Sequence, residues 1–236
     1  MISEQNALCV LDGIPVRLAW IVGLSPRHNQ RKYQRGLISQ TEEQSPRAVM
    51  TVERWIDLNC HPSTPSQSVR AIHVLVRRSA SAELQLTFRL DGDISRIRVP
   101  SPAVPRIGTE LWRHTCFETF IAVDGQPAYH EFNFAPSGEW TVYAFSGYRD
   151  GSPLADEMMN PQIAVRSSGS RLELDARVRL DRLSASHPRT SLRIGLSAVI
   201  EAIDGFSYWA LRHPADKPDF HNTEGFALLL DPPLTE

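Results

Sequence analysis

Segment 111–118 places polar and reactive side chains where a regular strand would have a uniform face. In an extended chain, successive side chains point to opposite faces. One face then carries an indole, an imidazole, a thiol and a carboxylate, from Trp112, His114, Cys116 and Glu118. The other face carries Phe117, which suits a core. Such departures from a regular pattern tend to mark functional sites.

Segment 129–134 forms a second mixed face. Tyr129, Glu131 and Asn133 share one side of the predicted strand, and Trp140 and Tyr143 add aromatic surface on the next strand of a hairpin. Aromatic planes stack on the apolar C–H faces of sugars, whereas carboxylates and amides hydrogen-bond the hydroxyl edges. The two segments together therefore predict a binding site for a carbohydrate or a related small molecule.

A third departure lies near the C-terminus, where aromatic and charged side chains alternate with histidines. The candidates are Trp209, His213, Lys217, Asp219 and His221. The chain has two lysines, and Lys217 is the only one after residue 50. Because lysine supplies a compact point charge, we expect Lys217 to pair with Glu118 or Glu131. The alternative is a buried network of ion pairs that holds the last loop to the sheet.

The elements that must position these residues are predicted to be strands. From about residue 69 onward, apolar residues recur with a period of two, most clearly in 171–180. Turn signals such as Asp-Gly separate these segments. We predict an all-β fold, an antiparallel and jelly-roll-like β-sandwich of about ten strands. Short helices are expected near 181–185 and 51–59, and 94–99 is a candidate for a further short strand.

Length and composition limit the domain organisation and the partners. The chain has 236 residues, of which 42% are hydrophobic and 22% charged, so we predict one globular domain at 50–236. Residues 1–49 are predicted to be a disordered or loosely ordered extension, because 25–48 lacks an apolar period. The net charge of −2 argues against nucleic-acid binding. Because the apolar segment 7–24 is interrupted and follows no basic residue, we expect no membrane span, no signal peptide and a cytoplasmic protein.

Four segments carry a resemblance to a known family. They read Leu-Trp-Arg-His-Thr-Cys-Phe-Glu at 111–118, Glu-Phe-Asn-Phe-Ala-Pro-Ser-Gly-Glu-Trp at 131–140, Tyr-Trp-Ala-Leu at 208–211 and Lys-Pro-Asp-Phe-His at 217–221. Together they resemble the bacterial DOMON-like proteins, which are related to the family-nine carbohydrate-binding modules. The resemblance implies a β-sandwich with a ligand groove on one sheet, and a sugar or haem as the ligand. It also suggests that Trp112 and Trp209 stack on the sugar.

We therefore predict a non-catalytic domain that binds a sugar-like small molecule in a tryptophan-lined groove. The predicted ligand-binding residues are Trp112, His114, Glu118, Glu131, Asn133, Trp140, Trp209, His213, Lys217, Asp219 and His221. No catalytic residue and no metal ligand is predicted. The sequence leaves the oligomeric state open.

Three alternatives stay open. The first is haem binding through an axial histidine, with candidates His114, His130, His213 and His221. The second is glycoside hydrolysis by Glu118 and Glu131, which would lie about 5 Å apart on neighbouring strands. The third is a scaffold that binds another protein. Convergence of the aromatic and carboxyl side chains on one cleft would favour small-ligand binding over a scaffold.

Overall fold

The computed structural model describes residues 10–11, 14–15, 55–154 and 156–233. The chain divides into two units, Met1–Ala48 and Val49–Glu236. In the first unit, β1 (Val10–Leu11) and β2 (Ile14–Pro15) pair in an antiparallel manner. The rest of the predicted extension, residues 1–49, lies outside the described residues, so its disorder stays a prediction.

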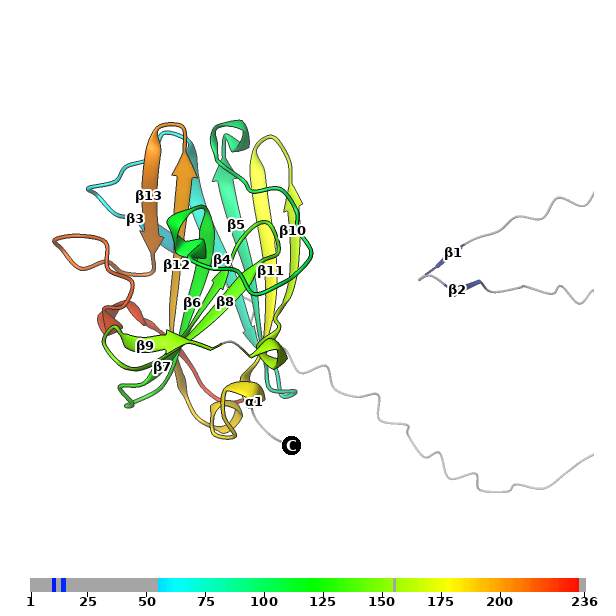
Figure 1. Ribbon diagram of the computed structural model, residues 1–236, viewed down its shortest axis with the longest axis vertical. Coiled ribbons are helices and arrows are strands. Elements are labelled where there is room, and N and C mark those ends of the chain that lie inside the picture. Colours follow the sequence, from blue (N-terminus) through cyan, green and yellow to red (C-terminus); the bar gives the residue numbers. More distant parts are fainter. Residues whose placement is uncertain (1–9, 12–13, 16–54, 155, 234–236) are drawn as a thin grey trace, which may run out of the picture. The chain divides into compact units, whose positions relative to one another are not determined.

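Antiparallel strands make up most of the second unit (Figure 1). The strands are β3 (Trp55–Cys60), β4 (Val69–Arg78), β5 (Glu83–Gly92), β6 (Cys116–Val123), β7 (Tyr129–Phe134), β8 (Trp140–Gly147), β9 (Asp150–Pro153), β10 (Gln162–Ser167), β11 (Arg171–Arg179), β12 (Leu192–Ala202), β13 (Gly205–Ala210) and β14 (Leu228–Leu230). The helical elements are short: α1 (Leu180–Leu183) and the 3₁₀ turns η1 (Ile94–Arg96), η2 (Leu111–Arg113), η3 (Glu157–Met159), η4 (His187–Arg189) and η5 (Thr223–Gly225). The predicted all-β fold is confirmed.

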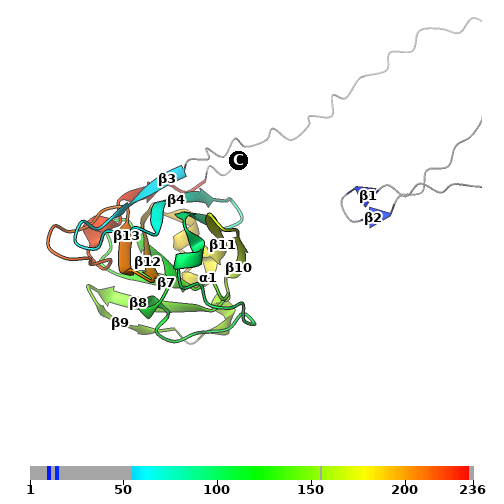
Figure 2. The same ribbon diagram turned by 90° about the horizontal axis from the view of Figure 1, so that it is seen from above.

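The strands form one long sheet that folds over itself. Its order is β10-β11-β5-β4-β3-β13-β12-β6-β7-β8-β9, and β14 pairs with β12. β3 and β13 pair through only two residue pairs, Trp209 with Cys60 and Ala210 with Asn59. At this short contact the sheet passes from one layer of the sandwich to the other. Figure 2 shows β3 and β4 on one side of the domain and β8 and β9 on the opposite side.

The core lies between these two layers. Phe88 of β5 and Phe117 of β6 meet there with ring centroids 5.1 Å apart, and both are fully buried. In β11 the predicted alternation holds, because Leu172 and Leu174 are buried whereas Arg171 is exposed. Removing apolar side chains from water at every second position is the main force that holds the layers together.

Two short elements differ from the predictions. The predicted helix at 51–59 is wrong, because Trp55–Cys60 forms strand β3 and buries Leu58 in the core; residues 51–54 lie outside the described part. The candidate strand at 94–99 contains the 3₁₀ turn η1, which Asp93 caps by accepting a hydrogen bond from the Ser95 N–H at 3.1 Å. In the described part of the chain, no helix has the length and apolar character needed to cross a membrane.

Candidate functional site

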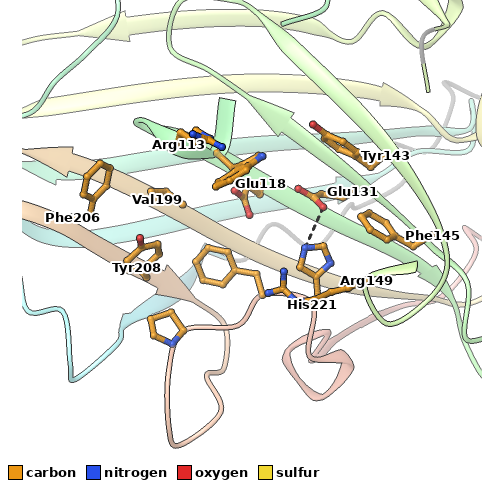
Figure 3. A pocket seen from close by; sticks show the side chains of 13 residues that line it. Arg113, Glu118, Glu131, Tyr143, Phe145, Arg149, Val199, Phe206, Tyr208 and His221 are labelled. Carbon is orange, nitrogen blue, oxygen red and sulfur yellow. Dashed lines mark ion pairs between the residues drawn. The ribbon is translucent and has the colours of Figure 1, made fainter. Parts of the chain in front are cut away.

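A cavity of about 590 Å³ lies on the outer face of the layer that contains β6, β7, β8, β12 and β13 (Figure 3). Aromatic, carboxyl and guanidinium groups dominate its wall. The lining residues are Trp112, Arg113, Glu118, Glu131, Tyr143, Phe145, Arg149, Val199, Phe206, Tyr208, Pro218, Phe220 and His221. The volume falls within the range of about 300–1,000 Å³ that is usual for small-molecule sites.

Strand alternation turns two glutamates toward this cavity. Phe117 and Phe132 point into the core, so their neighbours Glu118 and Glu131 point to the opposite face. Glu118 lies opposite Asn133, which is two residues along β7 from Glu131. The glutamates are therefore diagonal neighbours, whose separation is typically about 7–8 Å with somewhat closer Cβ atoms, and not a directly opposed pair at the spacing of about 5 Å that the hydrolase alternative assumed.

Glu131 is fixed by hydrogen-bonding groups on both of its oxygens. The Tyr129 hydroxyl accepts from the Arg149 N–H at 3.3 Å and forms a hydrogen bond of 2.9 Å with Nδ1 of His221. Nε2 of His221 faces Oε2 of Glu131 at 3.6 Å, the contact dashed in Figure 3. Asn133 donates to Oε1 at 2.6 Å.

Burial decides the charge of this contact. It raises the pKa of Glu131 to about 7, although the hydrogen bond from Asn133 and the charge of Arg149 act in the opposite direction. Burial and the positive charge of Arg149 lower the pKa of His221 to about 4. Between these two pKa values both groups are mainly uncharged, so the contact of 3.6 Å is not an ion pair near neutral pH.

Glu118 has fewer hydrogen-bond partners than Glu131. Its side chain is buried, and Ser197 donates to its Oε2 at 3.0 Å. Among the residues that the structure describes, no donor reaches Oε1, and this oxygen remains accessible from the cavity. Burial and the charge of Glu131 raise the pKa of Glu118 well above its usual value. The cavity therefore contains one carboxyl oxygen that is ready to bond a ligand.

The two arginines that line the cavity already have acidic partners. Arg149 donates to Asp219 at 2.7 Å. Arg113 lies 2.8 Å from Glu110, and its guanidinium is 5.1 Å from the ring centroid of Trp112. Within residues 55–154 and 156–233, no arginine or lysine forms an ion pair with either cavity glutamate. The positive charges of the wall are thus compensated, whereas the carboxyl groups lack a cationic partner.

Aromatic rings flank the glutamates. Figure 3 shows Tyr143 and Phe145 on one side of them and Phe206 and Tyr208 on the other. The strand order agrees, because β8 and β13 lie on opposite sides of the pair β6 and β7. Trp112 is the most exposed of the lining tryptophan, tyrosine and phenylalanine side chains, at 45%. The cavity therefore combines flat apolar surfaces at its sides with carboxyl groups between them.

Comparisons with solved structures give the fold a context. A proposed carbohydrate-binding protein from Bacteroides uniformis is similar, with a TM-score of 0.58 and 12% identity over 73% of this chain and 84% of that chain. At this low identity, the likeness shows a shared fold.

Two family 9 carbohydrate-binding module structures from Caldicellulosiruptor kristjanssonii are more distant. The one with cellotriose has a TM-score of 0.47 and 10% identity, over 74% of this chain and 80% of that chain. The one with glucose has a TM-score of 0.42 and 9% identity, over 71% and 80%. No protein-family model matches the sequence, and no curated protein matches it either.

Several predicted site residues do meet in one place. Those that line the cavity are Trp112, Glu118, Glu131 and His221. Asn133 and Asp219 stand behind the wall, where Asn133 holds Glu131 and Asp219 holds Arg149. Aromatic and carboxyl groups thus meet in one cavity, with a smaller set of residues than the sequence indicated.

The two tryptophans on strands β8 and β13 do not belong to this set. Trp140 and Trp209 are 2% and 6% exposed and belong to the core between the layers. The indole N–H of Trp209 donates to Ser207 Oγ at 3.0 Å, which satisfies its one polar atom. The prediction that Trp140 and Trp209 contact the ligand is wrong, because alternation turns both toward the core.

Three further predicted residues lie away from the cavity. Lys217 is exposed, and no ion pair joins it to a cavity glutamate in the described ranges, so the predicted pairing is wrong. His213 hydrogen-bonds the carbonyl of Asn59 at 2.8 Å. His114 lies 2.7 Å from Glu201 and lines a separate hollow of about 480 Å³. Neither of these two histidines lines the cavity, whereas His221 does.

Other lining residues had not been predicted. Phe206 and Tyr208 occupy positions of β13 that alternate with the inward Trp209, so knowing the direction of Trp209 would have placed them on the outer face. Arg149 adopts a left-handed conformation, with φ of 55°, in the turn after β8, where no periodic signal exists. In the part of the chain that the structure describes, no group of three or more His, Cys, Asp or Glu residues could hold a metal ion.

Proposed function

We propose that this domain binds a carbohydrate in the cavity that contains Glu118 and Glu131. The observation that carries the proposal is the arrangement of the wall, in which aromatic rings stand on both sides of two carboxyl groups. A sugar ring needs both surfaces at once, because its C–H face is apolar and its hydroxyl edge is polar. The fold shared with the Bacteroides uniformis protein, a proposed carbohydrate binder, supports this function.

The protonation of the glutamates suits hydroxyl groups, which both donate and accept hydrogen bonds. Because the pKa of Glu131 is raised to about 7, its carboxyl group carries a hydrogen for about half of the time at neutral pH. A protonated carboxyl group donates through one oxygen and accepts through the other. Oε1 of Glu118 is the acceptor that has no protein partner among the described residues. Binding by these groups requires no chemical step.

The experiment is calorimetric titration of the full chain at pH 7 with glucose and with disaccharides of glucose and glucosamine. We expect saturable binding of at least one disaccharide. Trp112→Ala should weaken it about tenfold, which corresponds to about 1.4 kcal/mol, because the most exposed ring of the wall is lost.

Trp55→Ala is the matched control. Trp55 is similarly exposed, at 38%, and stacks under the Arg89 guanidinium at 4.1 Å without lining the cavity. Its loss should leave the affinity unchanged. Absence of saturable binding by every sugar, or equal affinities in the Trp112→Ala variant and the unaltered chain, would reject the proposal.

A further inference from the structure

The cavity glutamates are unusual in being buried without a cation. Glu118 and Glu131 are 2% and 5% exposed. Buried ionised carboxylates are normally paired with a cationic side chain or a metal. Among the described residues, the basic group nearest to either is the His221 imidazole, at 3.6 Å from Glu131, and it is uncharged near neutral pH. The pair therefore lacks the partner that buried carboxylates usually have.

The arginines of the wall do not fill this role. Arg149 is neutralised by Asp219 at 2.7 Å, and Arg113 by Glu110 at 2.8 Å. Each of these two pairs has no net charge. When both cavity glutamates are ionised, the wall and its direct partners thus carry two uncompensated negative charges. The charge of Arg149 acts on Glu131 from a distance, but no arginine or lysine among the described residues forms a direct ion pair with either glutamate.

The surroundings of the glutamates also favour a cation. The face of an aromatic ring carries partial negative charge and attracts an ammonium group within about 6 Å of its centroid. Tyr143 and Phe145 stand on one side of the glutamates and Phe206 and Tyr208 on the other. Tyr143 lies directly opposite Glu131 on the neighbouring strand, so an ammonium group bound to Glu131 would lie close to this ring. A neutral sugar would use the rings but would give the carboxyl groups no cationic partner.

We infer that the ligand of this cavity is an amino sugar, whose ammonium group bonds Glu118 Oε1 and the neighbouring carboxyl group of Glu131. This inference rests on the proposed carbohydrate binding and names the class of sugar. The ammonium group supplies three donors, and its hydrogen bonds to carboxylates are about twice as strong as those between neutral groups. Glu118 Oε1 is the acceptor that is free to receive one of them.

Binding of a cation also changes the protonation of the two glutamates. A bound ammonium group favours the ionised form of both carboxyl groups, so protons leave the site when the ligand enters. The other titratable or charged groups near the pair are Cys116, Tyr129, Tyr143, Arg149, Asp219, His221 and the Arg113–Glu110 pair. Burial keeps the thiol and the phenols of Tyr129 and Tyr143 protonated, and Asp219 stays ionised beside Arg149, so the released protons come from the glutamates.

Three disaccharides that differ only at the second carbon of each sugar test the inference. They are chitobiose with free amino groups, cellobiose with hydroxyl groups and N,N′-diacetylchitobiose with neutral amides. Calorimetric titration of the full chain at pH 7 should give an affinity for chitobiose at least tenfold above those of the other two. In two buffers of different ionisation enthalpy at pH 5.5, where the amino groups of free chitobiose already carry their protons, chitobiose binding should release protons and cellobiose binding should release none.

Glu118→Gln should reduce the chitobiose affinity to about that of cellobiose, because the amide keeps the shape but not the charge. Glu224→Gln, which removes an exposed carboxylate outside the cavity, is the control and should keep the preference. Equal binding of chitobiose and cellobiose would overturn the amino-sugar inference and leave carbohydrate binding standing. Choline, a cation that is not a sugar, is titrated in the same way. If it binds and no disaccharide does, both the inference and the proposed function are rejected.

Discussion

The raised pKa of Glu131 predicts that the domain becomes less stable as the pH rises through the neutral range. Below pH 4.5, the usual pKa, the carboxyl group is protonated in the folded and unfolded states and contributes nothing. Between 4.5 and about 7 the unfolded chain ionises while the folded protein keeps the proton, so stability falls. Above the folded pKa the loss is complete and constant.

The size of the loss follows from the two pKa values. At about 1.4 kcal/mol for each pH unit, the interval from 4.5 to about 7 amounts to about 3 kcal/mol. Glu131→Gln removes the titration, so its stability relative to the unaltered chain should rise by about 3 kcal/mol from pH 4.5 to 7.5. Glu118 acts in the same direction, because burial and the charge of Glu131 raise its pKa.

Urea unfolding followed by tryptophan fluorescence measures this difference at pH 4.5, 6 and 7.5. The buried Trp140 and Trp209 report on the core, and the slope of each transition checks that both proteins expose the same surface. Glu224→Gln controls for the change in net charge, because its carboxylate is exposed. If the stability difference between Glu131→Gln and the unaltered chain stays constant over this range, the argument from burial is refuted.

Two packing predictions complete the set. Gly195→Ala would place a Cβ 2.6 Å from Cδ1 of Phe226, so we expect a cost of about 1–3 kcal/mol and a lower melting temperature. Gly147→Ala, which meets nothing within 4 Å, should melt like the unaltered chain. Arg78 donates to three backbone carbonyls at 2.6–2.8 Å, so Arg78→Met should cost about 3 kcal/mol or more, measured by urea unfolding. Equal stability of Arg78→Met and Arg78→Lys would contradict this role.

The sheet was predictable where alternation runs over many residues. β11 has nine residues, and its period of two is visible without any partner strand. β3 has six residues, and three inward positions are too few to separate a strand from a helical turn. Segment 111–118 is only partly extended, because Leu111–Arg113 forms the 3₁₀ turn η2 and β6 begins at Cys116. Alternation carried back from β6 therefore could not place Trp112 and His114.

The direction of a strand face is a separate question from its periodicity. On β7, the two phenylalanines made the core face evident, and Glu131 was placed correctly on the other side. On β13 both faces carry aromatic rings, so the sequence alone could not decide between Trp209 and Tyr208 for the core. Burial of Trp209 against the opposite layer decides it, and that contact depends on strands distant in the sequence.

Lys217 shows why rarity in the composition is a weak guide to position. A lone lysine near acidic residues suggested an ion pair with the glutamates, yet the loop turns Lys217 outward and brings Phe220 and His221 to the cavity. The Tyr129 hydroxyl holds His221 there at 2.9 Å. Had the lysine reached Glu118, the pair would be neutral and the cavity would suit a neutral sugar. Because it does not, the carboxyl groups keep an unmatched charge when ionised, and that charge is what distinguishes an amino sugar from a neutral sugar as the ligand.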